Sequence, residues 1–340
     1  MPYAERTEMY KEIERIRKRP LIVYVTSTRQ GGNGGQMGSD VIPEFCELIN
    51  TIPKSEKKVD LLVVSQGGDP IVPWRIIGLL RERFHKIAVI IPYTAQSAAT
   101  ILSFGADEII MHPFACLGPI DPQITDLTNP QRPRMFSAED LKCFAEFMSS
   151  DMKVSDADFG KNSIELLGRV LDPLSIGAAK KSMKLSENLA NKLLSLHMTD
   201  KDKINNIVEE YNNKSHHGYT ISRSEAKSAG LPVKNPDPGL EKLMWGIWMD
   251  IESELKCRVP FHPPGLLLGK TNAQGVPLQS ARENTDIAVL ESKDLKCTCR
   301  VQTMVSFTQV VPMGINTPQI NIAVDVVPLG WDRERRGDIQ

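Results

Sequence analysis

Four short motifs between Ser65 and Gln123 decide how this chain folds: SQGGDP (65–70), AQSAAT (95–100), GADEIIMHP (105–113) and LGPIDPQ (117–123). A glycine pair, Gly67–Gly68, follows one apolar strand, and Ser97 follows the next. If the loops at neighbouring strand ends converge, backbone N–H donors lie beside a hydroxyl nucleophile. That combination is what acyl transfer requires.

The flanking pattern predicts an α/β fold with a parallel sheet. Apolar runs at 21–26, 59–65, 87–92 and 107–111 read as buried strands, and helices are predicted at 3–18, 40–52, 72–84 and 95–104. Strands that are continuously apolar and alternate with helices indicate a parallel sheet covered on both faces. The segment from Ser27 to Gly38 is rich in Gly, Asn and Gln and is predicted to be a mobile loop.

After Pro122 the pattern becomes helical. Helices are predicted at 138–149, 164–171, 175–198, around 204–211 and, after a linker at 231–239, at 240–255. Ser222 and Glu225 form a capping box that opens one further short helix. Alternation near the end of the chain predicts strands. The predicted divisions are an N-terminal helix (1–19), a main domain (20–234), and a C-terminal helix with a β-rich segment (235–340).

Composition excludes several classes of partner. The 340 residues carry 41 basic and 42 acidic side chains, a net charge of −1, so we expect neither nucleic acid nor an anionic membrane as partner. Residues 1–19 lack the apolar core of a signal peptide, and no apolar run reaches the roughly 18 residues of a membrane span. The six cysteines include no C-x-x-C pair, which favours reduced thiols in a cytoplasm.

Each candidate residue of the site has an ordinary structural alternative. An isolated glycine pair is most often a plain strand–helix turn, and a serine at a helix start is most often a cap. Their occurrence together favours the site: Gly67 and Gly68 aim N–H groups outward, and the amide of Ala98 supplies a second oxyanion donor next to Ser97. We place Ser97 one or two positions inside the helix, where capping explains it less well.

A serine nucleophile needs a base, and the sequence offers histidines and lysines. His112 ends a strand and reads as structural, and the pair His216–His217 reads as a solvated loop. Lys180 stands among small residues in IGAAKKS (176–182), where enclosure of its stem would lower its pKa.

Two further pairs read as structural. Cys297 and Cys299 share one strand face without companion ligands, so we assign them to the core and predict no metal. Trp245 and Trp248 on the 240–255 helix read as packing, against the core or a neighbouring subunit.

These motifs together resemble the serine dehydrogenase proteinase family, within the wider Clp protease, signal peptide peptidase A and crotonase group. The resemblance runs from about Pro20 to Leu231 and also includes RPLIVYVTS (19–27), GGQMGSDVIPEF (34–45), LLRERF (79–84) and HHGYTISRSEAKSAGL (216–231). It implies a ClpP/crotonase-type spiral of βαβ units with a helical insertion.

The resemblance also implies roles for individual residues. Gly67 and Gly68 match the oxyanion glycines and Ser97 the nucleophile. Gly177-A-A-Lys180 matches the G-x-x-K motif of a serine–lysine dyad, with Lys181 as the next choice. Clp proteases place a histidine in the loop that here reads LGPIDPQ, with Asp121 near the matching place, so a Clp-type triad looks absent.

The sequence thus predicts a cytoplasmic serine peptidase that acts on peptide or unfolded protein through an acyl-enzyme and forms a homo-oligomer. Ser97 and Lys180 are the predicted catalytic pair, with Lys181, Asp121 and His112 as alternatives. No cofactor fingerprint is present, and none is predicted. Two other functions stay open on the same fold: a crotonase-type acyl-CoA enzyme, which needs no serine nucleophile, and a non-catalytic scaffold or interaction protein.

Overall fold

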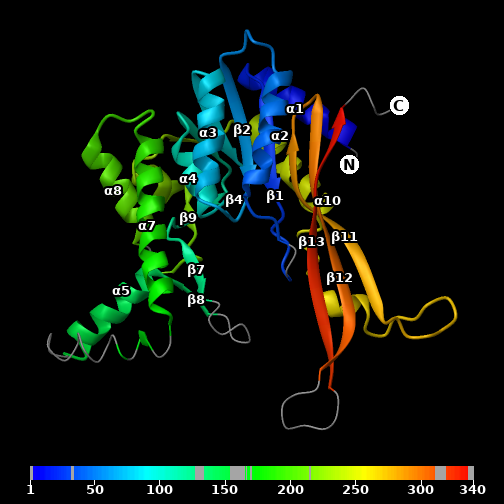
Figure 1. The fold of residues 1–340 in the computed structure, drawn as a ribbon. Helices are drawn as coiled ribbons and strands as arrows, with labels where there is room; N and C mark the ends of the chain where they lie inside the picture. The colour runs from blue at the N-terminus through cyan, green and yellow to red at the C-terminus, as the bar shows by residue number, and fades with distance from the viewer. Residues whose placement is uncertain are drawn as a thin grey trace.

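The computed structural model describes residues 3–31, 34–126, 134–153, 165, 167–168, 171–213, 216–310 and 319–335. An eight-stranded mixed sheet with strand order β10-β5-β3-β2-β1-β11-β12-β13 forms its centre (Figure 1). In chain order the elements before the helical insertion are α1 (Tyr3–Arg17), β1 (Leu21–Thr26), η1 (Ser39–Val41), α2 (Ile42–Thr51), β2 (Lys58–Val64), α3 (Ile71–Arg83), β3 (Lys86–Ile91), β4 (Thr94–Ala95), α4 (Ala98–Phe104), β5 (Glu108–Met111) and β6 (Cys116–Leu117).

The remaining elements hold the insertion and the C-terminal part of the chain. They are β7 (Gln123–Asp126), β8 (Arg134–Ser137), α5 (Ala138–Glu146), the π-helix η2 (Phe147–Asp151), α7 (Pro173–Leu194), α8 (Lys201–Asn212), β9 (Ile221–Ser222), α9 (Arg223–Ser228), β10 (Val233–Lys234), α10 (Pro238–Glu254), η3 (Pro263–Leu266), β11 (Ser280–Glu291), β12 (Leu295–Val310) and β13 (Gln319–Arg335). Of the helix predicted at 164–171, residues 164, 166, 169 and 170 lie outside the described residues.

The predicted α/β class is confirmed, and its parallel part is β10-β5-β3-β2-β1. Alternate residues of β1 point to opposite faces of the sheet. Tyr24 joins the large core that includes residues of α2, α3, α4, α7 and α8, whereas Val23 joins a second core formed with α1 and α10. Burial on both faces explains why these strands read as continuous apolar runs.

Two predicted boundaries were wrong. Residues 233–234, predicted as part of a linker, form β10, because Val233 pairs with Ile109 and adds an edge strand to the sheet. The helix predicted from residue 95 begins at Ala98, since Thr94 and Ala95 are held extended in a small second sheet, β4-β6-β9.

The C-terminal strands extend the main sheet. β11 pairs antiparallel with β1, and β12 and β13 follow as hairpins that project beyond the rest of the sheet (Figure 1). The sheet is therefore continuous across the predicted domain boundary at 234/235, and the domain division stays a prediction. Cys297 and Cys299 lie buried on β12, as predicted for core positions.

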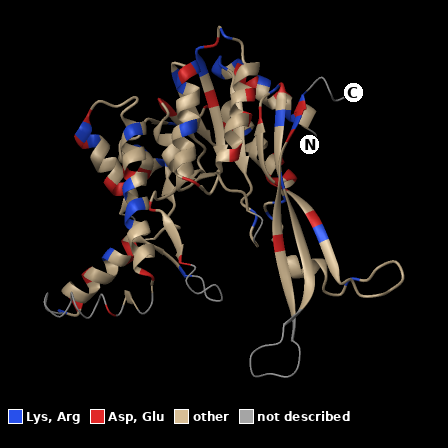
Figure 2. Cartoon of the chain, in the orientation of Figure 1, with Lys and Arg blue, Asp and Glu red and all other residues tan. Residues whose placement is uncertain are grey.

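A buried ionic cluster ties the two ends of the chain together. Arg6 of α1 is fully buried and forms ion pairs with Asp250 of α10 and with Glu291 of β11. Tyr10 donates a hydrogen bond to Glu291. Elsewhere, acidic and basic side chains are interspersed along the helices (Figure 2).

Candidate active site

Ser65, at the end of β2, joins the two loops of the candidate site. Its hydroxyl accepts a hydrogen bond from the Gly67 N–H (3.1 Å) and one from the Thr26 hydroxyl (2.8 Å). Its carbonyl accepts one from the Gln96 N–H (3.0 Å), and Ser65 and Ala95 form a parallel bridge. The glycine loop and the serine loop are thereby held side by side, as the sequence predicts.

Ser97 is held in an unusual backbone conformation. Its φ of 51° and ψ of −117° lie outside the regions that ordinary L residues occupy, and strain of this kind clusters at functional sites. The residue stands at the N-cap of α4, not inside the helix as predicted, because the helix begins only at Ala98. Its side chain makes no capping hydrogen bond, so capping does not explain the serine.

The contact between the loops explains why residue 67 is glycine. A Cβ added to Gly67 would lie 2.8 Å from the Ser97 Cβ and 2.9 Å from the Gln96 carbonyl oxygen. Its φ of 107° is one that side-chain-bearing residues rarely adopt. Gly67 is therefore needed for close approach to the serine, whereas Gly68 is needed for close approach to the Met37 backbone.

Two backbone N–H groups near the serine are available to a ligand. Gly68 forms a parallel bridge with Met37, in which the Met37 N–H donates to the Gly67 carbonyl and the Asp69 N–H donates to the Met37 carbonyl. Neither bond uses the Gly68 N–H, which has no acceptor within the described residues. Ala98 is the first residue of α4, where an N–H has no intrahelical acceptor. Such donors can stabilise the anionic oxygen that develops during acyl transfer.

A histidine and a carboxylate meet at the same site. His217 Nδ1 lies 2.9 Å from Asp121 Oδ1, and Asp121 also accepts a hydrogen bond from Gln123. The bond with Asp121 raises the pKa of His217. With Nδ1–H donating to the carboxylate, the lone pair of His217 is on Nε2, which has no hydrogen-bond partner among the described residues.

Neighbouring contacts hold Asp121 and His217 together. Ile120 N–H donates to the carbonyl of Tyr211, which brings the Asp121 loop against the end of α8. Thr100 of α4 accepts a hydrogen bond from the Gly118 N–H (3.0 Å) and donates to the Gly118 carbonyl (2.9 Å). The Asp121 loop is thus bonded both to the helix that follows Ser97 and to the helix that precedes His217.

One cavity of about 770 Å³ is lined by the glycine pair, Ser97 and His217, but not by Asp121 or Ala98. Its lining includes Gly67, Gly68, Ser97, Gln123, Ser186 and His217. Asp121 lies behind His217 and is almost fully buried. The cavity therefore combines a hydroxyl with no hydrogen-bond partner among the described residues, a histidine oriented by a carboxylate, and the backbone donor of Gly68.

The other predicted bases lie elsewhere. Lys180 and Lys181 are exposed on α7 and do not line this cavity, although Ser182 and Ser186 of the same helix do. His112 is buried away from the cavity, where its Nδ1 accepts the Phe114 N–H and its ring stacks on Trp245. Burial lowers the pKa of His112.

The interpretation of His217 as solvated was wrong. Its side chain is 36% exposed and paired with Asp121, whose 96-residue separation along the chain gives no local signal. His216 is exposed and accepts the Gly218 N–H through its own Nδ1, so only one of the two adjacent histidines faces the site.

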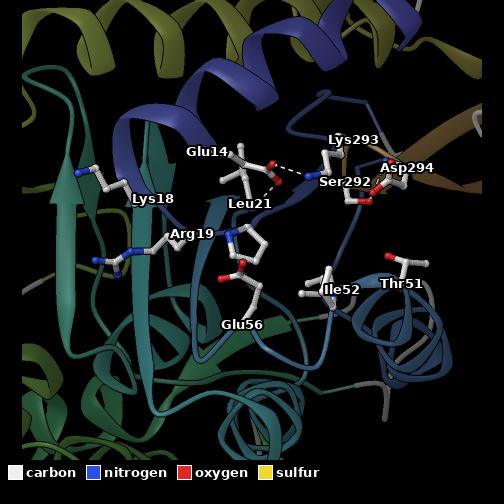
Figure 3. A pocket seen from close by; sticks show the side chains of 12 residues that line it. Glu14, Lys18, Arg19, Leu21, Thr51, Ile52, Glu56, Ser292, Lys293 and Asp294 are labelled. Carbon is white, nitrogen blue, oxygen red and sulfur yellow. Dashed lines mark hydrogen bonds and ion pairs between the residues drawn. The ribbon is translucent and has the colours of Figure 1, made fainter.

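A second cavity, of about 390 Å³, lies at the amino end of β1, away from the loops that follow the strands (Figure 3). Glu14 there pairs with Lys293 at 2.8 Å and accepts the Leu21 N–H, so its carboxylate is already satisfied. This cavity has the character of a junction between α1, α2 and the β11–β12 turn.

Comparison with known proteins bears on residues 41–147. This segment, which we call the SDH-type segment, matches the family described as "ClpP-like SDH-type serine proteinase". The resemblance predicted from the motifs is confirmed for this segment. The SDH-type segment contains Gly67, Gly68, Ser97 and Asp121, whereas Lys180 and His217 follow it.

Curated relatives match over a shorter stretch. Two uncharacterised proteins of Methanocaldococcus jannaschii, MJ0137 and MJ1495, are 36% and 37% identical over 81 residues. That stretch is 24% of this chain and 28% and 27% of the relatives, so the match spans little more than a quarter of their length.

Similar solved structures are proteases of low sequence identity. A mutant of 1510-N, a membrane-bound stomatin-specific protease, is 14% identical with a TM-score of 0.39, over 64% of this chain and 80% of that one. ClpP1 from Listeria monocytogenes is 10% identical with a TM-score of 0.36, over 67% and 99%. The ClpP catalytic domain from Plasmodium falciparum is 11% identical with a TM-score of 0.37, over 70% and 96%.

The described residues contain neither a candidate membrane span nor a candidate metal site. None of their helices combines the length and the apolar character that crossing a bilayer requires. Within the same residues, no group of three or more His, Cys, Asp or Glu side chains is arranged to hold a metal ion.

Proposed function

We propose that this chain is a serine peptidase that cleaves extended or unfolded polypeptide through an acyl-enzyme on Ser97. The observation that carries the proposal is the strained, uncapped Ser97 in contact with Gly67, in one cavity with His217. The match of the SDH-type segment to a family of serine proteinases supports it.

The proposed reaction begins with the Ser97 hydroxyl. Its oxygen attacks the carbonyl carbon of the scissile bond while His217 Nε2 takes the hydroxyl proton. The carbonyl oxygen becomes an oxyanion and accepts hydrogen bonds from the Gly68 and Ala98 N–H groups. The C–N bond then breaks, His217 passes its proton to the leaving amine, and an acyl ester remains on Ser97. Water, deprotonated by His217, hydrolyses this ester and restores the hydroxyl.

Asp121 orients the base in this scheme. Its bond to Nδ1 fixes the tautomer and stabilises the imidazolium that forms when the ring takes the proton. The absence of a Ser97–His217 hydrogen bond does not weigh against the pair, because catalytic hydrogen bonds in unliganded sites are often long and shorten when substrate binds.

The Ser97–Lys180 dyad predicted from sequence is the rival form of the same proposal. Geometry favours His217, because Lys180 is exposed and outside the cavity lining, and a lysine base needs burial to be neutral. The two schemes share the nucleophile and the oxyanion donors and differ only in the base.

One experiment separates them. We would follow cleavage of an unfolded, fluorescently labelled protein by the wild type and by Ser97→Ala, His217→Ala and Lys180→Ala. His216→Ala and Lys181→Ala are matched controls from the adjacent positions. We expect Ser97→Ala and His217→Ala to lose at least about 10³-fold in kcat/KM, with the three other variants within about twofold of wild type. Full activity in Ser97→Ala would refute the proposal, and selective loss in Lys180→Ala would establish the lysine as base.

The proposal includes the compartment and assembly predicted from sequence. We propose a cytoplasmic protein, which fits the six cysteines, all of them unpaired. We also propose a homo-oligomer, because β13 at the sheet edge exposes Val324, Val326 and Leu329 by 42%, 48% and 50%. Sedimentation velocity of the full chain tests the oligomer, and a monomer at all concentrations would exclude it.

A further inference from the structure

Another cavity, next to the one that holds Ser97, is walled by aromatic rings. Its volume is about 590 Å³, and its lining includes Tyr93, Trp245, Trp248 and Cys116. Gln66 and Gln96 line both this cavity and the one that holds Ser97. These two glutamines immediately precede Gly67 and Ser97, so the cavities meet at the proposed oxyanion loop and nucleophile. We call the cavity lined by Tyr93, Trp245 and Trp248 the aromatic cavity.

We propose that the aromatic cavity binds an aromatic side chain of the polypeptide substrate, close to the scissile bond. This inference rests on the proposed peptidase function and adds a substrate preference to it. The volume lies within the range of about 300–1,000 Å³ that is typical of ligand cavities. Because Gln66 and Gln96 line both cavities, the aromatic cavity lies next to the Ser97 site, where a side chain beside the scissile bond could enter it.

The rings in this cavity are held in place before any ligand arrives. Trp248 of α10 is 1% exposed and stacks on Tyr93, with ring centroids 5.1 Å apart and an angle of 10° between the planes. Tyr93 nevertheless remains 40% exposed. Trp245 is fixed in turn by stacking on His112 at 4.9 Å. A fixed ring with an open surface can contact another ring at little cost in side-chain entropy.

The charges around the aromatic cavity favour a neutral occupant. Glu252 and Arg258 are the only charged residues in its described lining, and they pair with each other at 2.7 Å. A charged substrate side chain would therefore lose water without gaining a free partner of opposite sign. Thr28, Thr94 and Thr220 supply hydroxyl groups, so a tyrosine is accommodated as well as a phenylalanine.

The test measures binding separately from hydrolysis. We would titrate peptides of the form acetyl-Gly-Gly-X-Gly-Gly-amide into the full-length Ser97→Ala protein, with X as Phe, Ala, Asp or Lys. Tryptophan fluorescence reports binding because Trp245 and Trp248 line the cavity. We expect the Phe peptide to bind about tenfold more tightly than the Ala peptide, and the Asp and Lys peptides to bind no more tightly than Ala.

Three variants in the Ser97→Ala background locate the preference. Tyr93→Ala removes an open ring and should reduce the Phe/Ala ratio to within about twofold. Thr220→Phe fills the cavity from an exposed position and should do the same, which guards against a folding defect in Tyr93→Ala. Phe114→Ala is the matched control, since Phe114 is 68% exposed and contacts Trp245 but does not line the cavity. It should leave the ratio unchanged.

The outcomes separate this inference from the proposed function. Equal affinity for the Phe and Ala peptides, or a Phe preference that survives both Tyr93→Ala and Thr220→Phe, would overturn the aromatic cavity as the binding site. A preference that follows the variants as expected supports it, whether or not the wild type hydrolyses peptide. Loss of the proposed function would instead appear as wild-type cleavage no faster than that of Ser97→Ala.

Discussion

Replacing Gly67 by alanine tests the contact on which the whole site depends. The added Cβ would lie 2.8 Å from the Ser97 Cβ, 2.9 Å from the Gln96 carbonyl oxygen and 3.1 Å from the Ala98 nitrogen. Two of these three atoms belong to the backbone, so they cannot move aside as a flexible side chain does. The methyl group therefore pushes the glycine loop away from the serine loop.

The expected cost has two parts. Holding a non-glycine residue at a φ of 107° costs about 1–3 kcal/mol. Forcing a methyl group into closely packed atoms costs about 1–3 kcal/mol more, part of which is relieved as the loops separate. We expect Gly67→Ala to lower the free energy of unfolding by on the order of 3 kcal/mol. Displacement of the oxyanion donors should lower kcat by about 10²-fold to 10³-fold.

Gly78→Ala is the matched control. Gly78 lies in the middle of α3, and a Cβ added there meets no atom within 4 Å. Because alanine favours the helix, this variant should be more stable by about 1 kcal/mol, with unchanged activity. Urea unfolding followed by circular dichroism measures the first quantity, and Ser97-dependent cleavage of an unfolded protein measures the second. If Gly67→Ala unfolds at the wild-type urea concentration and retains wild-type activity, the loops do not meet as described.

Three other variants test separate parts of the structure. If neutral His217 is the base, kcat/KM rises as the pH rises through the pKa of His217. Asp121→Asn removes the group that raises this pKa, so the acidic limb of the pH–rate profile should move to lower pH. An acidic limb that does not move would contradict the pairing of His217 with Asp121. Arg6→Met removes the guanidinium that pairs with the buried carboxylates of Asp250 and Glu291 and should cost about 3–5 kcal/mol in urea unfolding, whereas a loss below about 1 kcal/mol would count against the cluster. Ser222→Ala removes the hydrogen bond that the Ser222 hydroxyl accepts from the Glu225 N–H in the capping box and should cost about 1 kcal/mol without changing kcat/KM.

The parallel part of the fold could be predicted because its signals are local. The predicted strand at 21–26 agrees with β1 at both ends, and the predicted helix at 72–84 agrees with α3 to within one residue at each end. The pairing of β11 with β1 could not be predicted. Alternation reveals that a strand has two faces, but it does not identify which strand pairs with it. The Arg6–Glu291 pair that accompanies this pairing joins residues 285 positions apart.

The proposed nucleophile could be located from the sequence, whereas the proposed base, His217, could not, for a related reason. Ser97 lies in a motif where strand, glycine pair and helix start follow one another, so local pattern is enough to locate it. His217 belongs to a loop whose sequence is polar, and it meets Asp121 where the Ile120 N–H bonds to the Tyr211 carbonyl, a contact between two segments far apart in the sequence. Lys180 illustrates the opposite error: its small neighbours suggest enclosure, but α7 turns that position toward solvent.

The position of Asp121 gives the proposed base its strongest physical argument. Clp proteases place the catalytic histidine in the loop that matches residues 117–123 of this chain, where Asp121 stands near the corresponding place. From the sequence alone, the missing histidine therefore indicated that a Clp-type triad is absent. Here the histidine comes from the later loop, and the two residues are bonded at 2.9 Å. What catalysis requires is a neutral imidazole with one nitrogen anchored to a carboxylate and the other facing the nucleophile, whichever segment supplies each member. Exchanging the places of the acidic and basic residues preserves that requirement, so the loss of a histidine at one loop does not imply the loss of the pair.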